Sequence, residues 1–315
     1  GHNSHEKILS AMRPNLLRPF NFNRALKSVS GKKSNQLFQE TILELTKKWT
    51  AEKPANPSIF EPIAVENSAY PSDYLLPQTD AHLAVYALKK SPSSRNKIVR
   101  IEQGKEEFIS FTGIQITPYF ELQNDKILWD EYRKDARFAK QSYNVINIYD
   151  VKTKKTRTLT TKSRLYSPTL HPTEPQIACI SVDLDNRSSL KIINSENAEL
   201  VDSITMEMGI HIQQPKYDAT GAKIVAIAVG PAGTNLIAFD LNKKSYTFLL
   251  DWSNQQLERP LFYEDKIIFK AHYNGIDNLY LLDKGQVSAL TNASYGAFNP
   301  YVSSEGTLYY NDYKY

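Results

Sequence analysis

Short runs of hydrophobic residues alternate with polar turns over most of the chain. Residues 224–228, 236–239 and 248–250 are examples, and Gly, Asp, Asn and Lys residues separate such runs. Apolar runs of four to eight residues bounded by turn residues are typical of β-strands, and a short polar turn between two of them indicates a hairpin. The pattern therefore predicts a mainly β fold built from antiparallel strands.

The strand pattern repeats, and prolines mark the start of each copy. Pro215 begins the clearest one, in which a short strand leads through a turn closed by Gly221 to the apolar run 224–228. A period of about 40 to 50 residues is typical of β-propellers. The spacings are 47, 50, 47, 45 and 40 residues between six prolines: Pro71, Pro118, Pro168, Pro215, Pro260 and Pro300.

Each copy supplies four strands, which is the content of one propeller blade. A third strand ending in Asp precedes a fourth, as in 235–240 followed by 246–250. A parallel β-helix is the alternative, but its coils are much shorter. We therefore predict a six-bladed β-propeller with four-stranded antiparallel blades over residues 55–315. Five full copies occupy about 67–294, and a partial sixth runs from Tyr295 to Tyr315.

The partial sixth copy requires a means of closing the ring, because open edge strands leave unpaired N–H and C=O groups. In one solution Ile59 to Val65 pairs with the strands inside 298–311, so that both ends of the chain share one blade. In the other, the chain is truncated. The sequence leaves both open.

Residues 1–54 have a different pattern, which predicts a short α-helical segment. One helix is expected over 21–31, with Gly31 as its C-terminal stop, and another from Ser34 to about Glu52. Some fifty residues of short helices cannot form a convincing core alone. We expect this segment to be the remnant of a larger upstream domain.

Composition and charge limit the classes of partner and location that the chain can have. The 19 tyrosines and 13 phenylalanines favour sheet, and residues 1–54 hold 10 Lys and Arg against 4 Asp and Glu, whereas 55–315 hold 28 against 30. The basic run 152–157 is placed at a hairpin turn, so no nucleic acid is expected as a partner. Cys179, the single cysteine, lies in an apolar run and is interpreted as a buried thiol. No run of 18 apolar residues is present, so we expect no membrane span in this chain.

No complete catalytic, cofactor or metal motif is found. The zinc peptidase motif His-Glu-x-x-His and the serine hydrolase motif Gly-x-Ser-x-Gly are both absent from the sequence. The segment 183–186 lacks the Gly and Glu of a calcium loop, and 230–233 joins two strands, so turns are predicted at both. Catalytic, cofactor and metal residues are thus predicted as none, and the histidines are interpreted as loop, strand or solvated residues: His2, His5, His82, His171, His211 and His272.

The unit Pro-aromatic-x-Ser/Asp-x-x-Gly followed by an apolar strand resembles the TolB-type propeller repeat over roughly residues 67–315. It is also similar to the propellers of prolyl oligopeptidases. Upstream, residues 22–34 with Leu37 and Phe38 resemble the C-terminal tail of a gluzincin-like peptidase domain, of the kind fused to propellers in exported Bacteroidetes proteins. That resemblance implies a zinc-binding half upstream, which this chain does not include.

Together these features predict a non-catalytic binding module for a protein, peptide or glycan, exported to the periplasm or cell surface after removal of a signal peptide. Propellers hold many loops rigidly around one axis, which creates a concave site. Two alternatives stay open: a substrate-gating propeller of a zinc metallopeptidase-like protein, and a scaffold in cell-envelope assembly. Whether the parent protein is an enzyme is undecided by the sequence.

Overall fold

The computed structural model describes residues 3–15, 17–54, 56–63, 65, 70–138 and 140–313. Three positions used in the sequence-based predictions lie outside the described residues: His2, Asn67 and Tyr315. The chain divides into two compact units, residues 1–55 and 56–315.

The first unit is helical. The two helices predicted over 21–31 and from Ser34 to about Glu52 are confirmed. A further helix near the start of the chain was not predicted. Gly31 ends the second helix in the left-handed conformation at φ +76°, with its N–H donating to the carbonyl of Lys27 at 2.8 Å, as in a left-handed C-cap. The elements are α1 (Ser4–Met12), the 3-10 turn η1 (Arg13–Asn15), α2 (Asn21–Ser30) and α3 (Ser34–Glu52).

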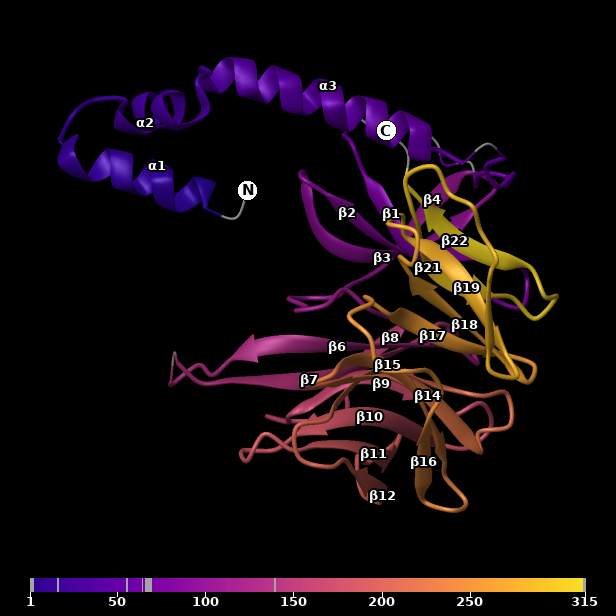
Figure 1. The fold of residues 1–315 in the computed structure, drawn as a ribbon. Helices are drawn as coiled ribbons and strands as arrows, with labels where there is room; N and C mark the ends of the chain where they lie inside the picture. Colours follow the sequence, from indigo (N-terminus) through magenta and orange to yellow (C-terminus); the bar gives the residue numbers. More distant parts are fainter. Residues whose placement is uncertain are drawn as a thin grey trace. The chain divides into compact units, whose positions relative to one another are not determined.

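The second unit consists of antiparallel sheets in which consecutive strands pair in order, so each sheet is a meander. The strands can be followed by their labels in Figure 1. The first three sheets contain β1 (Asp73–Thr79), β2 (Val85–Ser91), β3 (Ser94–Glu102) and β4 (Lys105–Phe111); β5 (Glu121–Gln123), β6 (Lys126–Lys134), β7 (Ser142–Asp150) and β8 (Lys155–Thr158); and β9 (Leu165–Leu170), β10 (Gln176–Val182), β11 (Ser188–Asn194) and β12 (Leu200–Thr205).

The remaining sheets repeat the arrangement and end with a shorter one. They contain β13 (His211–Tyr217), β14 (Lys223–Gly230), β15 (Gly233–Asp240) and β16 (Ser245–Phe248); β17 (Glu258–Tyr263), β18 (Lys266–Ala271), β19 (Asn278–Asp283) and β20 (Gln286–Ala289); and the pair β21 (Ala297–Val302) and β22 (Leu308–Asp312).

The first strands of the six sheets form a closed circuit. Each contacts the next in the order β1, β5, β9, β13, β17, β21, and β21 returns to β1. These strands are therefore innermost, and the sheets stand around a common axis as propeller blades do. The predicted mainly β propeller with four-stranded blades and a short N-terminal helical segment is confirmed.

The predicted count of six blades is wrong. The described residues form five four-stranded blades, and the sixth place in the circuit holds only the two-stranded sheet of β21 and β22, called the half-blade below. The proposed pairing of Ile59 to Val65 with this sheet is also wrong, since residues 56–63 and 65 contain no strand. Pro62 lacks the N–H that a ladder there would need.

Side chains attach the half-blade to the first blade instead. The Asn311 side chain accepts from the Leu76 N–H at 3.0 Å and donates to the Tyr74 carbonyl at 2.6 Å. The Tyr301 hydroxyl donates to the Thr79 carbonyl at 3.1 Å. Upstream residues reach the loop before β21, where the Ser58 N–H donates to the Asn292 carbonyl at 3.1 Å. The circuit is thus closed by hydrogen bonds between blades rather than by a strand shared between both chain ends.

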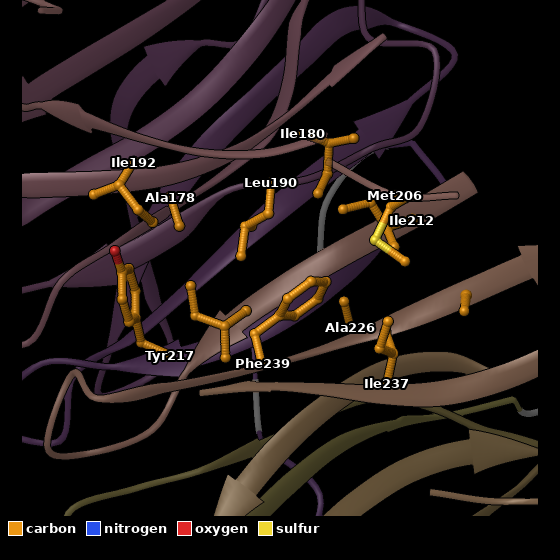
Figure 2. Packing of buried hydrophobic residues seen from close by; sticks show 12 residues of the cluster. Ala178, Ile180, Leu190, Ile192, Met206, Ile212, Tyr217, Ala226, Ile237 and Phe239 are labelled. Atoms are coloured by element: carbon orange, nitrogen blue, oxygen red, sulfur yellow. The ribbon is translucent and has the colours of Figure 1, made fainter. Parts of the chain in front are cut away.

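Hydrophobic layers between adjacent blades form the core. The largest lies between the third and fourth blades, where Leu190 and Ile192 of β11 point toward Tyr217 of β13 and Phe239 of β15 (Figure 2). Leu190 is fully buried, and Phe239 is 1% exposed. Equivalent layers separate the first and second, second and third, and fourth and fifth blades. Face-to-face packing of neighbouring sheets fixes the innermost strands around the axis.

Candidate functional site: the axial pocket

Proline and a left-handed residue produce a bulge in five of the six innermost strands. Pairing with the neighbouring strand shifts register at each of these places. The residue before the proline has a φ between +48° and +59° in every case: Leu76, Ser167, Gln214, Arg259 and Asn299. A bulge bends a strand and redirects its side chains. Here it occurs where each strand passes the axis.

The first of these bulges shows that the sequence pattern selected the wrong proline for the first repeat. Pro77, within β1, occupies the place that Pro168, Pro215, Pro260 and Pro300 occupy in their strands. Pro71, which the sequence pattern selected, lies before β1. Both prolines fit a period near 45 residues, so spacing alone could not separate them. The bulge geometry distinguishes Pro77 from Pro71.

A cavity of about 70 Å³ lies among the bulges, and we call it the axial pocket. Residues on either side of the bulge prolines line it, from strands at different places in the circuit. They are Leu76, Pro77, Gln78, Gln214, Pro215, Lys216, Arg259, Pro260, Leu261, Asn299, Pro300 and Tyr301, together with Tyr119 and Phe120 before β5. Side chains that are distant in sequence therefore converge at the axis.

Arg259 crosses the axis. It lies on β17, and its Nη2 donates to the carbonyl of Pro118, next to the diametrically opposite strand β5, at 2.6 Å. Its guanidinium carbon lies 5.3 Å from the centre of the Tyr119 ring, within the range of a cation–π contact. Its backbone N–H donates to the Gln214 side-chain oxygen at 2.6 Å. Burial lowers the pKa of Arg259, while Tyr119, Glu258 and Asp130 act in the opposite direction.

Lys216 also lines the pocket but is neutralised. Its ammonium forms an ion pair with Glu121, whose side chain is 1% exposed. The same carboxylate accepts hydrogen bonds from the Thr169 hydroxyl at 3.1 Å and from the Leu170 N–H at 2.8 Å. A buried carboxylate with this many donors is fully satisfied. The pair links the second, third and fourth blades.

Gln78 connects the first two blades beside the pocket. Its amide donates to the Phe120 carbonyl at 2.9 Å and accepts from the Leu122 N–H at 2.8 Å. The side chain thus substitutes for the backbone ladder that adjacent blades lack. Both ends of its amide are used internally, so Gln78 has a structural role at this site.

Asp130 of β6 is a half-buried carboxyl group whose charge acts on Arg259. Burial raises the pKa of Asp130, and hydrogen bonds from the Ser167 N–H at 3.3 Å and the Asn144 side chain at 2.9 Å oppose this increase. The Gln115 side chain donates to the carbonyls of Tyr119 and Asp130 at 2.6 and 3.1 Å. These bonds hold the segment before β5, which carries the pocket residue Tyr119.

The histidines considered from the sequence are dispersed. His171 packs against the edge of Tyr217 with ring centres 5.0 Å apart, and its Nδ1 accepts from the Glu174 N–H at 2.9 Å. His82 lies in an exposed turn, and His211 begins β13. Within the part of the chain that the structure describes, no three His, Cys, Asp or Glu side chains gather as metal ligands do.

The turns predicted from the sequence are confirmed. Residues 183–187 connect β10 to β11, with the Asp183 side chain accepting from the Arg187 N–H at 2.8 Å. Gly230 pairs with Gly233 at the hairpin of β14 and β15, and residues 151–154 connect β7 to β8.

Cys179 is fully buried, and burial raises the pKa of its thiol to about 12. None of the described helices is long and apolar enough to cross a membrane.

The pocket residues were missed by sequence reasoning, although a signal was present. The repeat holds its proline constant while the residues on either side differ from copy to copy, for example Gln214 and Lys216 against Arg259 and Leu261. Variable side chains at a constant backbone position indicate where a repeat scaffold is adapted to a ligand. These flanks line the axial pocket.

No protein-family model matches the chain, and neither does any curated protein. Among solved structures, a TolB from Agrobacterium tumefaciens shares 12% identity at a TM-score of 0.55, covering 76% of this chain and 89% of the other. The propeller domain of the Trilobed protease from Pyrococcus furiosus shares 12% identity at a TM-score of 0.48, covering 74% of this chain and 89% of the other.

TolB from Acinetobacter baumannii shares 19% identity at a TM-score of 0.44, covering 53% of this chain; the match spans only 42% of the length of that protein. The identities are low, so these similarities concern the fold. The similarity to the Agrobacterium tumefaciens protein shows that the second unit has a TolB-like β-propeller fold.

Proposed function

We propose that this chain is a non-catalytic binding module that takes a segment of a protein or peptide ligand at the axial pocket. The observation that supports this most is the convergence of side chains from β1, β13, β17 and β21 with Tyr119 at one small cavity. Ligand sites combine an apolar lining with a few placed polar groups. Here Leu76, Leu261 and the prolines give the apolar part.

The rigid ring supports the same proposal. Side chains tie neighbouring innermost strands to one another at the pocket, through Gln78, Glu121 and Gln214. A preorganised site loses little conformational entropy on binding. A peptide can thus be held without any chemical step, and the lining residues include no pair of nucleophile and base.

Selection from a displayed peptide library against the intact 315-residue chain, followed by hydrogen exchange on the complexes, tests the proposal. Selected peptides are expected to slow exchange at the backbone amides within 119–122 and 214–217, where Pro215 has no amide hydrogen. Protection confined to the outermost strands β4, β8 and β12 would contradict it. A glycan array run in parallel tests the remaining ligand class. If glycans protect the same amides and no peptide does so, the ligand is a glycan rather than a peptide.

We further propose that the module belongs to an exported bacterial protein, in which residues 22–38 are the tail of a gluzincin-like domain. Support comes from the sequence resemblance of this segment, which lies on α2 and α3. The reading frame upstream of Gly1 tests this. A His-Glu-x-x-His helix there would favour a gating role for the propeller in a zinc peptidase-like protein. A signal peptide directly before His2 would exclude that role.

A further inference from the structure

Arg259 differs from the other deeply placed cations of the propeller. Lys216 is paired with Glu121, and Lys270, which is 2% exposed, has its ammonium 2.8 Å from Asp277 and 3.4 Å from Glu258. Among the described residues, Arg259 has no carboxylate within 4.0 Å. Arg259 is half-buried, and even a partly buried charge without a counterion costs free energy unless other groups compensate for it. The Pro118 carbonyl and the Tyr119 ring compensate only in part.

The guanidinium also keeps unused donors. It has five N–H groups, and the bond to the Pro118 carbonyl uses one of them. The Tyr119 ring and this carbonyl both contact the guanidinium at the pocket, which leaves its other N–H groups available to a ligand there. Gln214, another lining residue, uses its amide oxygen for the Arg259 N–H. Its NH₂ group makes no hydrogen bond within the described part of the chain.

We propose that Arg259 is the receptor for a carboxylate of the ligand at the axial pocket, with the Gln214 amide as a second donor. This inference rests on the proposed function and specifies the chemistry of the ligand. A guanidinium matches a carboxylate through two parallel hydrogen bonds, and such charge-assisted pairs are about twice as strong as neutral ones.

Size and charge favour a carboxylate over a phosphate. The pocket has a volume of about 70 Å³, and Glu121 is paired with its lining residue Lys216. A planar group with one negative charge fits beside the Tyr119 ring. A dianion would keep an uncompensated negative charge there, because the Lys216 ammonium is already paired with Glu121.

The carboxylate has two possible sources in a peptide: the C-terminus, or an Asp or Glu side chain. Three probes distinguish them in calorimetric titrations at low ionic strength. These are Ac-Ala-Ala-Ala-OH, Ac-Ala-Asp-Ala-NH₂ and the neutral Ac-Ala-Ala-Ala-NH₂. We expect at least one acidic probe to bind about tenfold or more tightly than the neutral one, which corresponds to ~1.4 kcal/mol.

The Arg259→Gln variant tests the receptor itself. Gln is compatible with the bulge, because Gln214 has φ +54° at the equivalent position against +52° for Arg259. The variant should lose the preference for acidic probes. Arg187→Gln, a matched change of charge at an exposed residue of the 183–187 turn, should retain it. Arg259→Asn serves the same purpose if the Gln variant folds poorly, because Asn299 has φ +52° at its own bulge.

The outcomes separate this inference from the proposed function. Acidic and neutral probes binding equally, with protection at 119–122 and 214–217, would overturn the carboxylate assignment and leave the binding module intact. The assignment also fails if Arg259→Gln keeps the acidic preference. Failure of every probe and every selected peptide to protect the pocket amides would remove both.

Discussion

Arg259 donates a hydrogen bond of 2.6 Å to the carbonyl of Pro118, although 141 residues separate the two along the chain. The bond joins β17 to the segment that precedes β5, the innermost strand on the opposite side of the circuit, so it spans the propeller axis. The same residue is the cation at the axial pocket that has no carboxylate partner within 4.0 Å among the described residues. Scaffold and candidate site are therefore coupled, and the following predictions test them separately.

The Gln78→Ala variant should destabilise the propeller by about 1 to 3 kcal/mol. The substitution leaves the buried Phe120 carbonyl and Leu122 N–H without their partner, and unsatisfied buried groups carry a penalty of this size. Urea unfolding measures the change. Gln286→Ala on the exposed strand β20 is the control and should change stability by less than about 0.5 kcal/mol. Equal effects of both would refute the structural role of Gln78.

The buried pair of Lys216 and Glu121 should show strong coupling. Lys216→Met leaves the Glu121 carboxylate buried without a cation and should cost about 3 to 5 kcal/mol. Adding Glu121→Gln removes that charge while keeping acceptor and donor groups for Thr169 and Leu170. The double variant is therefore expected to be more stable than Lys216→Met alone. Additive losses in a double-mutant cycle would show that the two residues act independently.

Phe239→Ala should open a cavity between the third and fourth blades. The ring is 1% exposed and packs in the layer shown in Figure 2, so its removal should cost about 3 to 5 kcal/mol. Equilibrium unfolding is the measurement. Val287→Ala on β20, where the side chain is 38% exposed, gives the baseline for losing an outer apolar group. A loss no larger than that of the control would place Phe239 outside the core.

Glu106 should make stability depend on pH. Burial would raise its pKa, yet hydrogen bonds from Lys89, Tyr74 and Lys97 outweigh this effect and lower it. A carboxylate with a lowered folded-state pKa stabilises the protein above its unfolded pKa, and this contribution disappears as pH falls through the folded value. The stability difference between wild type and Glu106→Gln should thus be constant above about pH 5 and shrink below about pH 4. A difference that does not change with pH would contradict this.

The fold could largely be predicted because repeated strand quartets impose the same period on the whole second unit. The prolines at 168, 215, 260 and 300 mark real bulges in the innermost strands. The first copy was assigned to Pro71 instead of Pro77, because the bulge that distinguishes them depends on backbone conformation. The pairing of 59–65 with the half-blade, which the sequence left open, does not form, and Pro62 is a local reason. The segment instead contacts the half-blade through the rings of Phe60 and Tyr310, and Ser58 bonds to Asn292 in the loop before β21.

The candidate site could not be predicted in the same way. Tyr119, Gln214 and Arg259 come from three different repeats, and only the closed circuit brings them together. No motif connects positions that are 45 to 141 residues apart. The half-blade likewise depends on Asn311 and Tyr301 contacting β1, more than 200 residues upstream. Such contacts follow from tertiary packing rather than from local pattern.

The measurement that tests the central claim most directly is the ¹⁵N NMR signal of the Arg259 guanidinium, assigned by its loss in Arg259→Gln. Addition of the preferred acidic peptide should shift its Nε–Hε resonance in a saturable manner with the affinity found by calorimetry. The neutral peptide should produce at most a small change. An Arg259 resonance that stays unchanged while the acidic peptide binds would contradict the account.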